Sequence, residues 1–148
     1  MKAFYAGSFD PFTIGHLSIV VRALEIFDEL IIGVGFNPSK RSEREVEERI
    51  LLIQKCFKGI SRVKVFGYDG LTAEVAKEHG AGVLVRGVRN TIDFEKEKDL
   101  ANINLKVFGM PTVLLVAEPE ISMISSSMVR ELSHFGVDVR QFLAQDLE

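Results

Sequence analysis

The feature that most constrains the fold is a regular alternation of short apolar runs with segments of helical periodicity. The apolar runs predict five strands, at residues 3–6, 29–36, 62–67, 82–87 and 112–117. The second run, ELIIGVGF, is almost continuously apolar, which is typical of a strand that is covered on both faces. Strands that alternate with helices are joined by right-handed crossovers, so the pattern predicts a parallel sheet.

The segments between these runs carry apolar residues at helical spacing. The first amphipathic helix runs from Leu17, and the second follows Ser42, whose spacing from Glu45 is that of a capping box. Further helices are expected at residues 72–77, 92–108, 126–134 and 139–143. Since 148 residues are about one domain, we expect a single α/β domain over 1–148, a three-layer, Rossmann-like, doubly wound five-stranded parallel sheet.

Composition narrows the class of protein. The formal net charge of −3 argues against a broad nucleic-acid surface, because phosphate backbones are met by clustered positive charge. The single Cys56 excludes an internal disulfide, and no apolar run approaches the ~20 residues that span a bilayer. We therefore expect a soluble protein of the reducing cytoplasm that binds neither nucleic acid nor membrane.

Ligands of doubly wound sheets bind beyond the carboxyl ends of the strands, and the loop after the first strand reads GSFDPFTIGH, residues 7–16. Gly7 permits a tight exit from the strand and Ser8 offers a hydroxyl. Gly15 and His16 open the next helix, whose free N–H groups attract anions. The decapeptide predicts a phosphate site more strongly than a plain loop. No Gly-Lys-Ser/Thr occurs, and Gly33-x-Gly35 lacks a third glycine, so neither a P-loop nor the usual dinucleotide site is expected.

Later loops add cations and hydroxyl groups. Lys40 follows the second strand, and Arg86 and Arg89 follow the fourth, where guanidinium forks match phosphate oxygens. Residues 125–127 are three serines at a helix start; one is enough for an N-cap, so three indicate an added polar ligand. Arg130, one turn later, is expected to reach the same place.

Other polar residues are predicted to be structural. His79 and His134 precede glycines, as last-turn histidines do before a helix stop. Cys56 lies beside an apolar stripe without a histidine partner, so no catalytic thiol is expected. The charged residues of the fourth helix are predicted to be solvated, with the exception of Glu97.

The segments GSFDPFTIGH, NPSK, VEERILLI, LVRGVRNTIDFEKE and ISSSMVRE follow one another across nearly the whole chain. In this order the sequence resembles the nucleotidyltransferases with the T/H-x-G-H motif, and among them the bacterial phosphopantetheine adenylyltransferases. The resemblance implies a nucleotidyltransferase fold, and transfer of AMP from ATP to 4′-phosphopantetheine with Mg²⁺, giving dephospho-coenzyme A and pyrophosphate. It also implies a homohexamer and feedback inhibition by coenzyme A.

The resemblance also implies roles for residues at matching positions. His16 would stabilise the transition state, and no protein ligand of the metal is expected. Acceptor binding is implied for Ser8, Lys40, Thr72 and Arg86. ATP binding is implied for Ser8, Phe9, His16, Gly87, Val88, Arg89, Glu97, Ile121, Ser122, Met123, Ile124, Ser125, Ser126 and Ser127. Some members carry a tryptophan in place of Ile121 and a tyrosine in place of Lys96.

The chemistry agrees with these roles. An acceptor phosphate is already an anionic nucleophile, so the site needs positioning and charge neutralisation and no general base. Two alternatives stay open from the residues alone. One is another adenylyl- or cytidylyltransferase, acting on glycerol phosphate, nicotinamide mononucleotide or flavin mononucleotide. The other is a non-catalytic sensor that binds ATP without releasing pyrophosphate.

Overall fold

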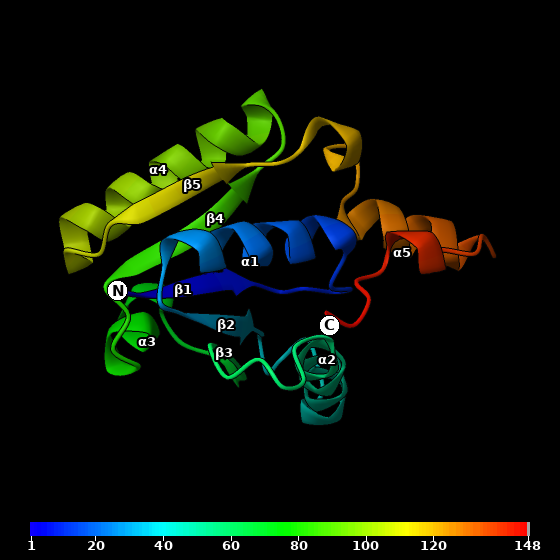
Figure 1. The fold of residues 1–148 in the computed structure, drawn as a ribbon, viewed down its shortest axis with the longest axis horizontal. Helices are drawn as coiled ribbons and strands as arrows, with labels where there is room; N and C mark the ends of the chain where they lie inside the picture. The colour runs from blue at the N-terminus through cyan, green and yellow to red at the C-terminus, as the bar shows by residue number, and fades with distance from the viewer. Residues whose placement is uncertain (148) are drawn as a thin grey trace.

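The computed structural model describes residues 1–147, which form one five-stranded parallel sheet (Figure 1). Its strands are β1 (Lys2–Gly7), β2 (Glu29–Gly35), β3 (Val63–Tyr68), β4 (Val83–Val88) and β5 (Thr112–Val116). The spatial order is β3-β2-β1-β4-β5, with β1 paired to β2 and to β4. The chain therefore builds outward from β1 in one direction and then returns to build in the other. The predicted α/β, doubly wound parallel sheet is confirmed, and its strand order reverses between β1 and β4.

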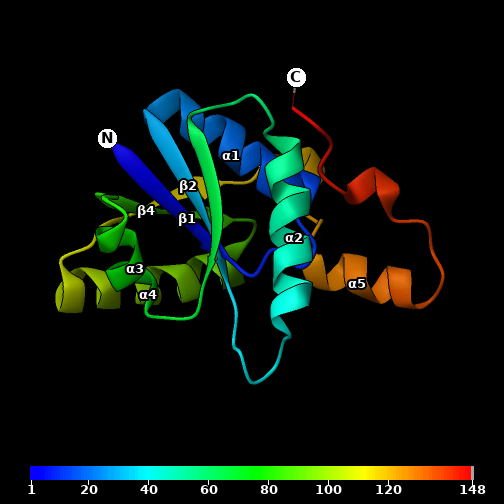
Figure 2. The same ribbon diagram turned by 90° about the horizontal axis from the view of Figure 1, so that it is seen from below.

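Helices cover both faces of the sheet. They are α1 (Ile14–Ile26), α2 (Glu43–Cys56), α3 (Thr72–Glu78), α4 (Thr91–Phe108) and α5 (Ser126–His134). Figure 2 shows α1 and α2 on the side of the sheet opposite α3 and α4. Among the described residues, no helix has both the length and the apolarity that a membrane crossing requires.

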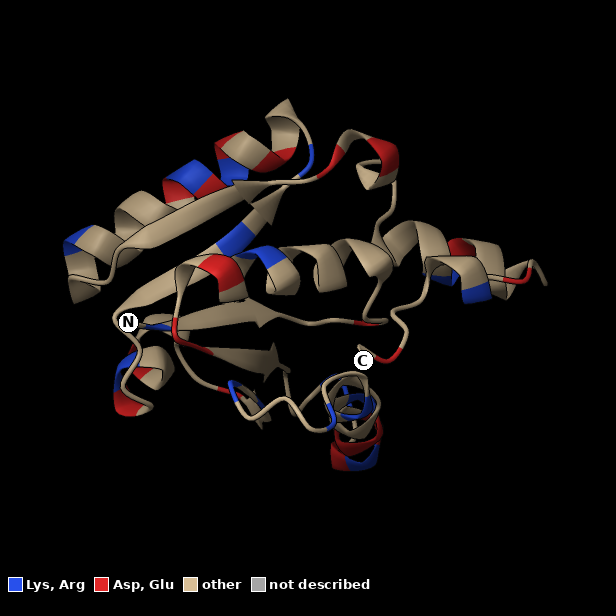
Figure 3. Cartoon of the chain, in the orientation of Figure 1, with Lys and Arg blue, Asp and Glu red and all other residues tan. Residues whose placement is uncertain are grey.

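Side chains alternate between the two faces along each strand, as the pleat requires. Ala3 and Tyr5 of β1 belong to the core beneath α1 and α2, whereas Phe4 and Ala6 belong to the core beneath α3. Each of β1, β2, β3 and β4 carries a single charged residue and β5 carries none, whereas both signs are interspersed on α2 and α4 (Figure 3). The sheet is thus buried on both faces, as the apolar runs indicate.

Capping residues explain several helix boundaries. Ser42 and Glu45 form the predicted capping box at the start of α2. α1 begins at Ile14, ahead of the amphipathic segment from Leu17, because the Thr13 hydroxyl accepts the His16 N–H and caps the helix. His79 and His134 end α3 and α5 ahead of glycines with positive φ, which confirms their structural reading.

The short helix predicted at residues 139–143 is only partly formed. Only a single 3₁₀ turn, Arg140–Phe142, forms there. Leu143 is extended and pairs with Thr13 in an antiparallel bridge, and the Ala144 N–H donates to the Phe12 carbonyl at 3.2 Å. The helix does not continue because residues 143–144 pair with the loop that precedes α1. The backbone of that loop supplies the hydrogen bonds that a longer helix would have made internally.

Candidate active site

A cavity of about 410 Å³ opens at the carboxyl ends of β1 and β4, where the strand order reverses. We call it the His16 cavity. It brings together the predicted residues Ser8, Phe9, His16, Arg86, Gly87, Val88, Arg89, Glu97, Ile121, Ile124, Ser125, Ser126 and Ser127. Three segments of the chain contribute, around the ends of β1, β4 and β5, so residues more than a hundred positions apart share one space.

His16 is held as a neutral hydrogen-bond donor. Its Nδ1 accepts the backbone N–H of Thr13 at 3.0 Å, so in the neutral ring the proton is on Nε2. The imidazole stacks on Phe12 with ring centroids 5.4 Å apart and meets the edge of Phe9 at 5.0 Å. Burial lowers its pKa to about 4, and the nearby positive charges of Arg86 and Arg89 act in the same direction. At neutral pH, this cavity-lining side chain therefore offers an Nε2–H group without a charge.

The turn at Phe9 is tightly packed. Phe9 has a φ of 47°, a left-handed conformation that is uncommon for an aromatic residue, and its ring is only 2% exposed. A Cβ at Gly7 would lie 2.9 Å from this ring, so the predicted need for glycine at this position has a steric cause. The turn leaves Ser8 on the wall of the His16 cavity.

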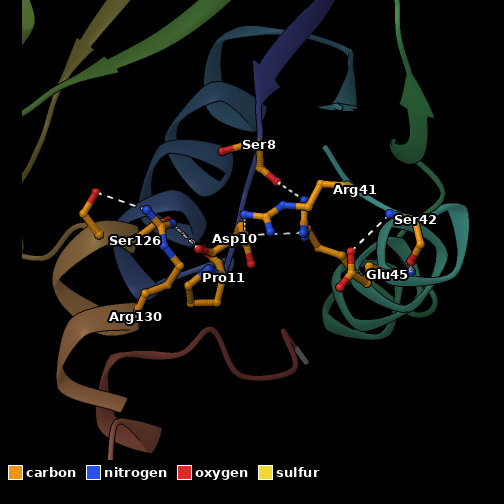
Figure 4. Close-up of polar contacts among 10 residues, drawn as sticks. Ser8, Asp10, Pro11, Arg41, Ser42, Glu45, Ser126 and Arg130 are labelled. Atoms are coloured by element: carbon orange, nitrogen blue, oxygen red, sulfur yellow. Dashed lines mark hydrogen bonds and ion pairs between the residues drawn. The ribbon is translucent and has the colours of Figure 1, made fainter. Parts of the chain in front are cut away.

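α2 holds this turn from one side (Figure 4). Arg49 donates to the Ser8 carbonyl at 3.1 Å and contacts the Asp10 carboxylate at 3.4 Å. Arg41, in the loop before α2, reaches the same carboxylate at 3.3 Å. The Arg49 side chain is only 12% exposed, so its contacts are largely shielded from solvent and position the backbone of the turn.

α5 holds the turn from the other side. Arg130 donates to the Asp10 carbonyl at 2.6 Å, and the Ser126 hydroxyl donates to the Pro11 carbonyl at 2.8 Å (Figure 4). The expectation that Arg130 reaches the ligand loops is met only indirectly, because the guanidinium is engaged with backbone and does not line the His16 cavity.

The three serines have internal partners. Ser125 is the N-cap of α5 and accepts the Met128 N–H at 3.1 Å, whereas the Ser127 hydroxyl lies 3.4 Å from Arg130 Nη2. Even so, all three line the His16 cavity, and the start of α5 faces the same space as the start of α1. Two helix N-termini with their positive dipole ends therefore border the cavity, which favours an anionic ligand.

Arg86, which lies within β4, and Arg89, in the loop after it, are both paired with carboxylates of α4. Arg86 binds Glu97 through Nε at 2.9 Å and through Nη2 at 2.7 Å, and its Nη1 donates to the Ala6 carbonyl. Burial acts to lower the pKa of Arg86, but its hydrogen bonds and ion pair with Glu97 outweigh this effect and raise it. Arg89 binds Asp93 at 2.9 Å. The prediction of a solvated Asp93 is wrong, since its side chain is 23% exposed and lies on the wall of the His16 cavity.

A smaller cavity of about 220 Å³ lies on the other side of the Arg86–Glu97 pair, and we call it the Thr72 cavity. Ala6, Arg86 and Glu97 line both cavities and so form their common wall. The other lining residues are mostly apolar: Gly70, Leu71, Thr72, Leu84, Leu100, Ala101, Asn104, Phe108 and Thr112. Thr112 is one of these lining residues, and its hydroxyl is buried without a hydrogen-bond partner among the described residues.

Three predicted residues lie outside both cavities. Lys40 is exposed in the loop between β2 and α2, where its backbone N–H donates to the Asn37 carbonyl at 2.9 Å. Ser122 donates to the Pro119 carbonyl at 3.1 Å, and Met123 is 66% exposed.

Comparison with known proteins supplies the family. The sequence model described as cytidylyltransferase-like matches residues 4–132. A phosphopantetheine adenylyltransferase of Phocaeicola vulgatus is 47% identical over 99% of this chain and 97% of its own length. One of Thermotoga neapolitana is 43% identical over 99% of this chain and 92% of its own length. The chain belongs to the phosphopantetheine adenylyltransferase family. The resemblance that the sequence motifs indicate is thereby confirmed.

Solved structures confirm the fold of this phosphopantetheine adenylyltransferase family member as that of the nucleotidyltransferases. A bifunctional NMN adenylyltransferase/ADP ribose pyrophosphatase of Francisella tularensis superposes with a TM-score of 0.73 at 14% identity, covering 99% of this chain and 45% of that protein. A putative nicotinate-nucleotide adenylyltransferase of Vibrio parahaemolyticus superposes with a TM-score of 0.64 at 16% identity, covering 97% of this chain and 93% of that one.

Sequence reasoning missed three polar side chains that line the His16 cavity of this family member: those of Tyr5, Thr13 and Asp93. Asp93 stands four residues after Arg89, and Thr13 stands three residues before His16 at a capping position, so both had a signal in their spacing. Tyr5 lies within an apolar strand and had none beyond its polar hydroxyl. Burial raises the pKa of Tyr5.

The carboxylates of the His16 cavity bear on how this phosphopantetheine adenylyltransferase family member would meet a metal. Asp93 and Glu97 are each paired with an arginine. Nowhere in residues 1–147 do three or more His, Cys, Asp or Glu side chains gather closely enough to hold a metal ion. This donor set fits Mg²⁺ that arrives already bound to nucleotide phosphates and water, which is a common form of binding for this ion.

Proposed function

We propose that this chain transfers the adenylyl group of ATP to 4′-phosphopantetheine, with release of pyrophosphate. The observation that carries the proposal is the pair of cavities that meet at Arg86 and Glu97. The His16 cavity, with two helix N-termini, suits the phosphates of ATP. The Thr72 cavity, which is mostly apolar and includes the side-chain amide of Asn104, suits the uncharged arm of the acceptor. The acceptor phosphate would then lie at their junction.

In the proposed reaction, a phosphate oxygen of the acceptor attacks the α-phosphorus of ATP. The bond from that phosphorus to the bridging oxygen breaks, and pyrophosphate leaves with the bonding electron pair. Because the nucleophile is already an anion, no side chain needs to remove a proton. His16 would donate its Nε2–H to an oxygen of the α-phosphate as charge develops in the transition state. A neutral donor at this position needs no change of protonation between binding and reaction.

The remaining contacts are assigned by cavity. Phe9, Gly87, Val88, Arg89, Ile121 and residues 124–127 line the His16 cavity and are proposed to bind ATP, while Thr72 and Arg86 are proposed to bind the acceptor. For Ser122 and Met123, which line neither cavity, ATP binding is proposed from the family alone. Ser8, which follows β1 on the wall of the His16 cavity, is proposed to contact both ATP and the acceptor. Lys40 lies outside both cavities, so its contact with the acceptor phosphate requires the loop before α2 to approach the junction.

Mg²⁺ is proposed to enter with the triphosphate and to neutralise part of its charge, with no carboxylate of the chain as a dedicated ligand. The expected result is that a chelator abolishes pyrophosphate release and that added Mg²⁺ restores it. Activity that persists in a chelator would contradict this part of the proposal.

A homohexamer, inhibition by coenzyme A and a cytoplasmic location are further proposals that follow from the family. Exposed apolar side chains support an assembly: Ile103 and Val107 of α4 are 57% and 63% exposed, and Val116 of β5 is 67% exposed. Light scattering on the purified protein measures the mass of the assembly, and a monomer at micromolar concentration would contradict the proposal. Coenzyme A added to the transfer assay tests the inhibition.

The test of function is pyrophosphate release from ATP and Mg²⁺ with 4′-phosphopantetheine. Parallel reactions contain nicotinamide mononucleotide, flavin mononucleotide, or glycerol phosphate with CTP. We expect turnover with 4′-phosphopantetheine only. Turnover with another acceptor would overturn the proposed substrate and keep the chemistry, whereas ATP binding without any turnover would indicate a sensor.

A further inference from the structure

We propose that Glu97 is a positioning residue, which holds the Arg86 guanidinium at the junction of the two cavities so that it can receive the acceptor phosphate. This inference rests on the proposed function. It departs from the family expectation that Glu97 binds ATP, because it places the effect of Glu97 on the acceptor side and routes that effect through Arg86.

The hydrogen bonds of Arg86 carry the first step. A guanidinium has five N–H bonds. Two of them donate to the two carboxylate oxygens of Glu97, at 2.9 and 2.7 Å, and one donates to the Ala6 carbonyl. Glu97 takes the side of the fork that contains Nε and Nη2. The two N–H bonds that remain, one on Nη1 and one on Nη2, have no acceptor among the described residues, so they are left for a ligand.

The surroundings carry the second step. Arg86 is on β4, Glu97 on α4 and Ala6 on β1, so three elements fix one planar group. The Glu97 side chain is 13% exposed and that of Arg86 is 30% exposed. A free arginine side chain has much rotamer entropy to lose when it binds an anion. With Glu97 in place, most of that ordering is complete before the acceptor arrives.

The oxygens of Glu97 carry the third step. Both accept hydrogen bonds from Arg86, so each already has a charged partner at short distance. Two of the roughly four lone-pair positions of the carboxylate are thus taken up by Arg86, which ties Glu97 to the guanidinium. The pair of Arg89 and Asp93 offers a contrast, because it lines the His16 cavity only and joins residues four apart at the start of α4. Asp93 therefore serves as the matched control.

The test is Glu97→Gln compared with Asp93→Asn and the wild type, with calorimetric affinities and steady-state kinetics for each substrate. Glutamine keeps the volume and removes the charge. We expect Glu97→Gln to weaken acceptor binding and raise the acceptor KM by about tenfold, because the fork of Arg86 loses a charged partner. The affinity and KM for ATP should change less than about twofold, well short of the tenfold change expected for the acceptor. Asp93→Asn should leave the acceptor values unchanged.

The outcomes separate the inference from the proposed function. Absence of turnover in the wild type would contradict the proposed function. Calorimetry with 4′-phosphopantetheine would still compare the acceptor affinity of Glu97→Gln with that of the wild type. Turnover in the wild type, with only the ATP values changed in Glu97→Gln, would overturn the positioning role and leave the function intact. Should Glu97→Gln fail to fold, Glu97→Asp takes its place. Aspartate keeps the charge on a shorter stem, which changes its reach to Arg86, so an unchanged acceptor affinity in the folded variant would contradict the inference.

Discussion

At the scale of single residues, the protonation of His16 is decided by its neighbours. The Thr13 N–H occupies Nδ1, aromatic rings cover the imidazole, and two arginines stand nearby. Each of these favours the neutral ring with its proton on Nε2. The site therefore meets a phosphate with a neutral hydrogen-bond donor, while positive charge comes from the helix ends and the arginines.

The first prediction concerns pH. The pKa of His16 is about 4 in the folded protein and near 6.5 in the unfolded chain, so as pH falls the unfolded state binds the proton first. This group should therefore lower the free energy of unfolding between about pH 6.5 and 4, with no further change below. An NMR titration of the His16 ring should show a midpoint well below 6.5. A midpoint at or above 6.5 would contradict the neutral-donor role.

His16→Ala should reduce kcat by about 10²–10³-fold, the usual cost of removing a donor aimed at developing charge. Binding of ATP should persist, because the helix N-termini remain. His134→Ala is the control, since that side chain is exposed at the end of α5 and should leave turnover unchanged. Near-normal turnover in folded His16→Ala protein would remove His16 from the mechanism.

At the scale of elements, close packing between strands decides which residues are tolerated. Gly33 lies in the middle of β2, and a Cβ there would overlap the fully buried Phe4 ring of β1 and lie 3.0 Å from Tyr68. In the sequence, Gly33 is part of Gly33-x-Gly35, which resembles a fragment of a nucleotide-binding motif. In the structure, this glycine has a packing role. It lets an aromatic side chain of the neighbouring strand lie flat on the sheet.

Gly33→Ala should therefore lower the free energy of unfolding by about 1–3 kcal/mol, the usual cost of overpacking a core. Gly82→Ala is the matched control. Its new Cβ would meet only the Met1 side chain, at 3.5 Å, which is an ordinary contact. Urea denaturation of both variants and the wild type gives the comparison. Equal stability of the two variants would show that the Phe4 ring can move aside.

At the scale of the whole molecule, the parallel sheet gathers every strand-to-helix loop of the site at one edge. The reversal of strand order places the loop after β1 beside the loop after β4, and the His16 cavity opens between them. The segment after α5 then returns to the loop before α1, and the Leu147 N–H donates to the Cys56 carbonyl at 2.8 Å. One core therefore joins the first strand to the last described residues.

This continuity predicts a single cooperative unfolding transition for the chain. Ligands that bind only the folded state should raise the midpoint of this transition. ATP at a hundred times its Kd should increase the free energy of unfolding by about 2.7 kcal/mol. Calorimetry with and without ATP measures both effects. Two separated transitions would contradict the expectation of one domain over residues 1–148.

How much the sequence determines depends on the distance between interacting residues. The strands, most helices and the capping box at Ser42 depend on residues a few positions apart, so periodicity and spacing predict them. The parallel sheet follows from the alternation itself, and its topology places the phosphate loops at one edge. The motifs are sufficient to indicate the family, which the comparisons confirm. The roles of individual residues stay predictions.

The tertiary structure alone decided the contacts between distant segments. Arg49 holds the Ser8 turn from 41 residues away, Arg130 holds it from a different helix, and Leu143 pairs with Thr13 where a helix was expected. These contacts arise from packing of whole elements, which gives local sequence no periodic signal. The same reason explains why Arg86 is fixed by Glu97 at the wall between two cavities. Sequence spacing brings both residues near a ligand site, and only packing of α4 against β4 decides that they bind each other.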